Sequence, residues 1–211
     1  MGIIFSRDAF SRRLAEEATP ETITSYARLY TNGDPPNLPH SHILYAYRDP
    51  FVRSALHAAK YRNRTDLCVL FGELLWYTFG EELSTESLLN GTPWLVIPIP
   101  LSKRHRRVRG YNQTEHIAEG FLKYADVRAF VFSPHSLLMT PSHTHQTHTL
   151  RKIERLKNSI GSFTVSDNAA IQGKTIILID DVITTGATLR EASRVLYAAG
   201  ARLIHYLAVA H

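Results

Sequence analysis

Cysteine is almost absent from this sequence. Cys68 is the single cysteine among 211 residues, so an internal disulfide is excluded. It lies at an apolar position of a helical pattern, which predicts a buried thiol. No apolar run of about 18 residues is present, and the first residues lack the long apolar segment of a secretory signal. We therefore expect a cytoplasmic protein without a membrane partner.

The two common nucleotide-binding fingerprints, Walker A and G-x-G-x-x-G, are also missing. Acidic residues are in the minority: 19 Asp and Glu stand against 24 Lys and Arg, which gives a formal charge of +5. A basic protein favours anionic partners such as phosphates, nucleotides or nucleic acid, but charge alone does not choose among them.

The two parts of the chain differ in pattern. Residues 1–90 are mostly helical in periodicity, and Asp49-Pro50 is a typical helix start, as is Thr19-Pro20. Thr65 begins a further helix, and residues 32–39 form a loop rich in turn-forming residues. We predict a helical N-terminal region over residues 1–90 and a separate core over residues 91–211.

Short apolar runs alternate with helical patterns in the second part. Strands are predicted at residues 94–98, 127–132, 162–165, 175–180 and 203–210, and helices begin after Asn112 and near Ala187. Such alternation is typical of a parallel α/β sheet. The polar stretch 133–158 lacks periodicity, which favours a functional or disordered loop.

The segment of residues 176–188 carries the clearest chemistry. Four aliphatic residues form a buried strand, and Asp180 and Asp181 stand at its carboxyl end, where open α/β sheets bind ligands. A loop rich in hydroxyl groups then leads into a helix. The free N–H groups and positive end of that helix form an anion site sized for a phosphate. Its predicted residues are Thr184, Thr185, Gly186, Ala187 and Thr188.

The two carboxylates would repel that phosphate, so they suit the group beside it. Ribose hydroxyls donate to carboxylates, and a carboxylate stabilises positive charge that develops on a sugar ring. The alternative is a strand end followed by an ordinary capped helix, which leaves the two adjacent acids unexplained.

These thirteen residues resemble the motif by which type I phosphoribosyltransferases bind 5-phosphoribosyl-1-pyrophosphate (PRPP). The resemblance implies a central parallel sheet flanked by helices, with Asp180 and Asp181 as catalytic residues. It also implies a separate unit on the acceptor side, called the hood. Residues 1–90 would supply the hood, and residues 91–211 would be the phosphoribosyltransferase core. Over about residues 42–211 the chain is similar to the ComF family, named for bacterial competence proteins. The matching residues are 56–62, with Lys60-Tyr61 at their centre, residues 97–101, residues 109–113, Gln146, Arg155, Asn158 and Phe163. Many relatives begin with a four-cysteine zinc module, which this chain lacks.

The family resemblance also suggests roles for two loops. Arg109 and Gly110, after the first core strand, would bind pyrophosphate, because Arg offers paired donors to a dense anion. Gln146 and Arg155 would belong to a flexible loop that closes over PRPP. The alternatives are a solvated basic loop and a disordered connector. Lys60-Tyr61-Arg62 would serve the hood or a second substrate, or end a helix that favours basic residues.

Three hypotheses follow. The first is a phosphoribosyltransferase-like protein that binds PRPP, with Mg²⁺ carried mainly by the pyrophosphate, and uses an unknown, nitrogen-containing acceptor. The second is a non-catalytic competence protein for DNA uptake that binds single-stranded DNA through the basic segment near Tyr111. The third is an enzyme acting on another phosphosugar. A homodimer is compatible with each of them.

Overall fold

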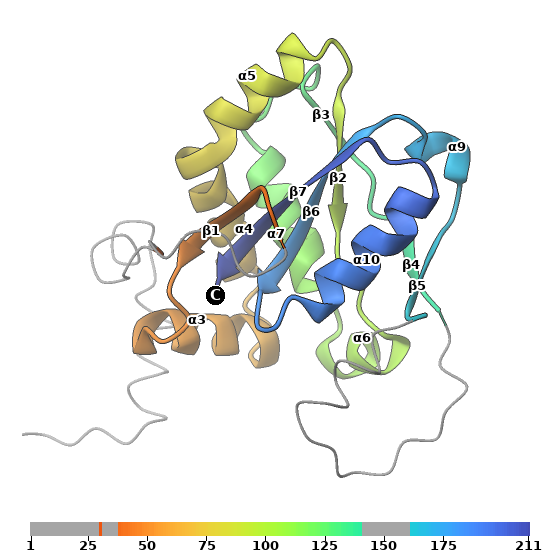
Figure 1. Ribbon diagram of the computed structural model, residues 1–211. Coiled ribbons are helices and arrows are strands. Elements are labelled where there is room, and N and C mark those ends of the chain that lie inside the picture. Colours follow the sequence, from red (N-terminus) through yellow and green to blue (C-terminus); the bar gives the residue numbers. More distant parts are fainter. Residues whose placement is uncertain (1–29, 31–37, 141–160) are drawn as a thin grey trace, which may run out of the picture.

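The computed structural model describes Tyr30, residues 38–140 and residues 161–211. Within them, parallel strands form one central sheet in the order β1-β7-β6-β2-β3 (Figure 1). The predicted α/β fold with a central parallel sheet is therefore confirmed. The strands of this sheet are β1 (Ser41–Tyr45), β7 (Leu203–Ala210), β6 (Thr175–Val182), β2 (Trp94–Pro98) and β3 (Phe130–Phe132).

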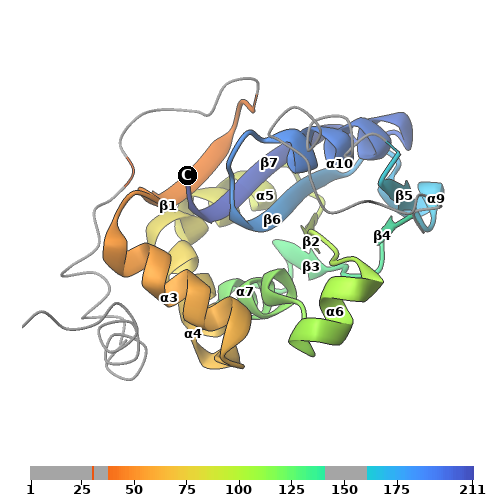
Figure 2. The same cartoon turned by 90° about the horizontal axis from the view of Figure 1, so that it is seen from below.

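Helices cover both faces of the sheet (Figure 2). One face packs against α3 (Pro50–Tyr61), α4 (Thr65–Leu75), the π-helical turn η1 (Trp76–Gly80), α5 (Glu81–Leu89) and α7 (Gln113–Leu122). The other face packs against α10 (Ala187–Ala198), α9 (Asn168–Ile171) and the antiparallel hairpin of β4 (Leu137–Met139) and β5 (Phe163–Val165). Helix α6 (Lys103–Arg109) follows β2.

Strand β6 is buried on both faces, which explains its unbroken aliphatic run. Ile177 and Ile179 pack with α3, α4 and α7, whereas Ile176 and Leu178 pack with α10. Because side chains alternate along a strand, the next two residues, Asp180 and Asp181, also point to opposite faces.

Two glycines let α4 and α7 approach closely. A Cβ atom at Gly72 would lie 2.0 Å from the carbonyl oxygen of Ile117, and one at Gly120 would lie 2.0 Å from that of Val69. This contact fixes α7, whose N-terminus faces the carboxyl end of β2.

The prediction of a mostly helical region up to residue 90 missed β1. This strand pairs with β7 in the central sheet, because its three buried residues, Ile43 to Tyr45, complete the cores on both faces. The division of the chain at residue 90 stays a prediction, although β1 comes from its N-terminal side.

Two further elements differ from the expected pattern. Residues 137–139 form β4 inside the stretch predicted as irregular, because Leu137 is buried and pairs opposite Val165. Residues 103–109 form α6 where a basic loop was expected. Ser102 caps this helix by accepting from the His105 N–H, and Gly110 ends it at φ 82°.

Other predictions are confirmed. Asp49 caps α3 by accepting from the N–H groups of Phe51 and Val52, and α4 begins at Thr65. The thiol of Cys68 is buried.

Thr19-Pro20 and residues 32–37 lie outside the described residues. No helix of the described part of the chain has the length and apolarity needed to cross a membrane.

Candidate functional site

The acid pair lies in the last residues of β6, so the strand extends two residues beyond its predicted end. The carboxylate Oδ1 of Asp180 accepts a hydrogen bond from the Asp181 N–H at 2.8 Å. Burial raises the pKa of Asp180 to about 7, and the neighbouring charge of Asp181 adds to this effect. One member of the pair therefore titrates near neutral pH, as is common for functional carboxyl groups.

Asp181 points to the face that α3 and α4 cover. Its Oδ2 lies 2.9 Å from Nζ of Lys60, in the last turn of α3, and these two side chains are 14% and 22% exposed. The thiol of Cys68 in α4 is close enough to sense this carboxylate. Burial, followed by the charges of Asp181 and Asp66, raises the pKa of that thiol to about 12.

The loop between β6 and α10 is the predicted phosphate site. Ile183 anchors its start, because its N–H donates to Ala210 at 2.9 Å and its carbonyl accepts from His211 Nδ1 at 2.8 Å. Gly186 precedes α10 at φ 70°, and a Cβ atom there would lie 2.7 Å from Leu38 Cδ1. A side chain at this position would be both strained and crowded.

Several donors of this loop remain available. Within the described residues, no acceptor is recorded for the backbone N–H groups of Thr184, Thr185 and Gly186, and the Ala187 N–H meets only Thr185 Oγ1, at 3.4 Å. The hydroxyl-bearing residues Thr184 and Thr188 are exposed. Together with the N-terminus of a twelve-residue helix, these groups form an arrangement suited to a phosphate.

The arginine predicted to bind pyrophosphate stands at the end of α6. Arg109 donates from Nη1 to Gln113 Oε1 at 2.9 Å, and its guanidinium lies 5.3 Å from the centre of the Tyr61 ring. Gln113 is 1% exposed, and its Nε2 has no partner among the described residues. Gly110 follows in the left-handed region and ends the helix. The other basic side chains of α6 are exposed.

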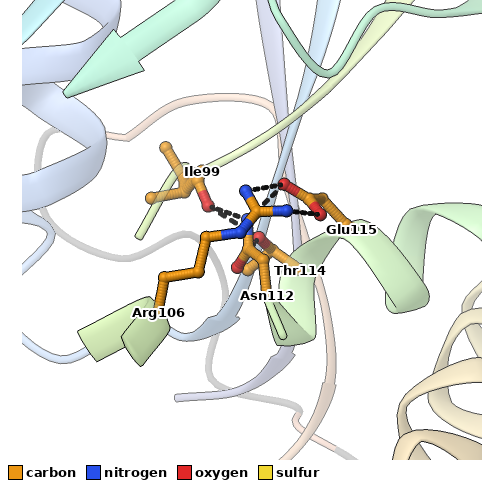
Figure 3. A network of polar contacts seen from close by, with 5 residues as sticks. All are labelled: Ile99, Arg106, Asn112, Thr114 and Glu115. Atoms are coloured by element: carbon orange, nitrogen blue, oxygen red, sulfur yellow. Dashed lines mark hydrogen bonds and ion pairs between the residues drawn. The ribbon is translucent and has the colours of Figure 1, made fainter. Parts of the chain in front are cut away.

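A polar network fastens the start of α7 to the end of β2 (Figure 3). Asn112 Nδ2 and Thr114 Oγ1 both donate to the Ile99 carbonyl, at 3.2 and 2.6 Å. The Ile99 N–H donates to Ile179, directly before the acid pair. Glu115 accepts from Asn112 at 3.2 Å and from Arg106 at 3.3 and 3.4 Å.

Helix α7 begins after Asn112, as predicted. Asn112 is its N-cap residue, but the Asn112 side chain makes no capping hydrogen bond. It is used instead to hold β2, because the buried Ile99 carbonyl needs donors.

The last turn of α3 touches several parts of this site. Besides the Lys60–Asp181 ion pair and the stacking of Tyr61 with Arg109, the hydroxyl of Tyr111 donates to the Ala59 carbonyl. Two roles for this turn were open from the sequence. Its signals there were a basic and aromatic triplet at a helix end and the family resemblance, and neither identifies a partner.

The structure therefore brings Asp180, Asp181, the loop of residues 183–186 and the N-terminus of α10 together. Their roles in binding or catalysis stay predictions, as does that of Arg109. The flexible-loop residues Gln146 and Arg155 lie outside the described residues. Among the residues that are described, no group of three or more His, Cys, Asp or Glu is arranged to hold a metal ion.

Comparisons with known proteins agree with this description. The family profile "Phosphoribosyl transferase domain" matches residues 122–211. Competence protein ComFC of Bacillus subtilis is 31% identical over 74% of this chain and 58% of its own length. Competence protein F of Haemophilus influenzae is 28% identical over 65% of this chain and 58% of its own. The chain thus spans somewhat more than half the length of these relatives.

Solved structures with a similar fold include the glutamine PRPP amidotransferase of B. subtilis complexed with ADP and GMP. It is 17% identical, with a TM-score of 0.43, over 72% of this chain and 30% of that one. The profile match and the parallel sheet flanked by helices identify the fold as that of type I phosphoribosyltransferases.

Proposed function

Since the chain belongs to the ComF family of phosphoribosyltransferase-like proteins, we propose that it binds PRPP and transfers the phosphoribosyl group to an acceptor. The observation that carries this proposal is the end of β6. There, two carboxylates precede a helix N-terminus and a loop whose N–H groups have no acceptor within the described residues. One half of this site fits ribose hydroxyls, and the other half fits the phosphate on the same sugar.

Each part of PRPP would meet a different element. Residues 184–188 would bind the 5-phosphate through backbone N–H groups and threonine hydroxyls. Asp180 and Asp181 would accept hydrogen bonds from the ribose. Arg109 would bind the pyrophosphate, and Gly110 lets the backbone turn at that point. Hydrogen bonds to charged groups contribute about 1.5–3 kcal/mol each, so a few of them anchor one phosphate.

The reaction would replace one bond at C1 of the ribose with another. A nitrogen nucleophile attacks C1, the bond from C1 to the pyrophosphate oxygen breaks, and pyrophosphate leaves with the electron pair. The nitrogen then loses its proton to solvent. The acid pair would stabilise the positive charge that develops on the sugar ring.

In this proposal, Mg²⁺ enters the site bound to the pyrophosphate of PRPP. The donor sets of the described residues do not form a resident metal cage, whereas pyrophosphate oxygens are the hard ligands that Mg²⁺ prefers. When bound, the ion would neutralise charge on the leaving group. A cytoplasmic location is likewise part of the proposal.

Calorimetric titration of PRPP with Mg²⁺ tests the assignment. The wild type is expected to bind saturably, and an Asp180→Asn/Asp181→Asn double variant is expected to lose binding while remaining folded by circular dichroism. Equal binding by both proteins would exclude the acid pair from the site. For turnover, Asp181→Asn alone is expected to reduce pyrophosphate release far more than it changes the melting temperature.

A second candidate function is binding of single-stranded DNA without catalysis. Helix α6 favours DNA binding, because no residue of this basic helix is buried and its charges can meet a phosphate backbone. Tyr61, which lies nearby, is 59% exposed and offers a ring on which a base can stack. The matched relatives include competence proteins and a DNA utilization protein. This function predicts affinity that falls steeply with salt. A salt-independent signal in a filter-binding assay would contradict it.

A further inference from the structure

The ion pair between α3 and β6 joins two distant segments of the sequence at the acid pair. Lys60 comes from a helix that is fixed in place, because Val52, Ala55, Leu56 and Ala59 of α3 are buried in the core. Its ammonium group therefore reaches Asp181 from a rigid support rather than from a loop. Among the described residues, it is the only cation recorded in an ion pair with either member of the acid pair.

The recorded contacts use one oxygen of each carboxylate. Lys60 occupies Oδ2 of Asp181, and the Asp181 N–H occupies Oδ1 of Asp180. In the described part of the chain, no partner is recorded for Oδ1 of Asp181 or Oδ2 of Asp180. Each carboxylate thus keeps one oxygen that can accept a hydrogen bond, and ribose hydroxyl groups are suitable donors.

Charge gives the second reason for a cation at this position. Two adjacent carboxylates repel each other, and the desolvation of Asp180 raises its pKa, while the Lys60 charge acts in the opposite direction. Within the described residues, the thiol of Cys68 also senses the charge of Asp181, and it stays neutral because burial raises its pKa to about 12. Without Lys60, the described surroundings would leave the pair without compensating charge.

We propose that Lys60 is a positioning residue for PRPP: it holds Oδ2 of Asp181, which leaves Oδ1 of the same carboxylate to accept from a ribose hydroxyl. This inference rests on the proposed function and adds to it a residue outside the motif. Lys60 acts through Asp181 and does not touch the substrate.

Two measurements on Lys60→Met test the inference. Calorimetry with PRPP and Mg²⁺ is expected to show about ten- to hundredfold weaker binding, the range for one lost hydrogen bond to a charged group. Carboxyl-carbon NMR titration of the ligand-free protein is expected to show a higher pKa for Asp180. Lys60→Arg restores a cation and is expected to return both readings toward those of the wild type.

A matched control removes the same charge from the same helix. Arg53 is exposed on α3, and Arg53→Met is expected to leave PRPP affinity and the Asp180 titration unchanged. Equal weakening by Arg53→Met and Lys60→Met would overturn the inference, because it would reveal a general charge effect. If Lys60→Met does not fold, Lys60→Gln takes its place and the same outcomes decide.

The two proposals fail in different ways. If the wild type binds PRPP and Lys60→Met binds it within about twofold, which is about 0.4 kcal/mol, Lys60 has no positioning role and the proposed function stands. If the wild type does not bind PRPP, the proposed function fails, and with it the role of Lys60 toward the ribose. The NMR titration then still reports whether Lys60 influences the ionisation of the acid pair. An Asp180 pKa that is the same in Lys60→Met and in the wild type would exclude this electrostatic role as well.

Discussion

Replacing Asp180 with asparagine is expected to stabilise the folded protein above neutral pH. The pKa of Asp180 rises from 3.8 to about 7 on folding, first because of burial and then because of the charge on Asp181. Between these two values the folded state binds the proton that the unfolded state has released. The free energy of unfolding therefore falls as pH rises from about 4 to about 7.

The rise in the pKa of Asp180 sets the size of this effect. A rise from 3.8 to about 7 corresponds to at most about 4 kcal/mol in the free energy of unfolding above pH 7. Asp180 is partly exposed, so solvent screening reduces the expected gain to about 2 kcal/mol. Asparagine keeps an Oδ1 acceptor for the Asp181 N–H, so the recorded hydrogen bond of this side chain can survive the substitution.

Urea denaturation of both proteins at pH 4, 5.5 and 8 measures the difference. The two stabilities should coincide near pH 4 and diverge as pH rises, with the variant more stable. Asp66→Asn is the contrasting control, because the hydrogen bonds and charge of Arg64 lower the pKa of Asp66. The Asp66→Asn variant should not become more stable than the wild type as pH rises. A constant difference between Asp180→Asn and the wild type at all three pH values would refute the reasoning.

Two other predictions concern groups away from the acid pair. Burial, with the charges of His42 and His40, lowers the pKa of His205 from 6.5 to about 4, so about 3 kcal/mol of stability should be lost as pH falls between these values. His205→Phe should remove this part of the pH dependence in denaturation curves at pH 7 and 4.5; an unchanged slope would contradict it. Gly120→Ala should lower the free energy of unfolding by about 3 kcal/mol, because the new methyl group meets the Val69 carbonyl. Thermal melting checks it, and a melting temperature equal to that of the wild type would show that α4 and α7 move apart freely.

Local patterns were enough to predict the central part of the site. The aliphatic run of β6, the two acids and the start of α10 follow one another in the chain, so strand, loop and helix signals could be read together. The predicted start of α10 and the predicted strand β7 are confirmed. The strand end was placed two residues too early, because Val182 still pairs with Ala210 in the sheet, beyond the two acids that interrupt the apolar run.

The features that escaped prediction depend on distant partners. Strand β1 forms because β7 offers an edge, and β4 forms because β5 pairs with it across a long interval of sequence. Helix α6 has no buried residue and hence no apolar periodicity; its caps, Ser102 and Gly110, were the available signal. The contact of Lys60 with Asp181 could not be derived at all, because no spacing rule connects a helix end with a strand so far along the chain.

The strand order has a consequence for how this protein is made. A ribosome releases β1 early, yet its recorded partner in the central sheet is β7, which is synthesised near the end of the described chain. The middle strand, β6, is also synthesised late. Strand β2 can therefore pair with β6, its second neighbour besides β3, only after most of the described chain has been made. Such long-range pairing slows folding and leaves apolar edges uncovered during synthesis. We therefore expect truncation before β7 to yield an aggregating chain, not a smaller folded domain.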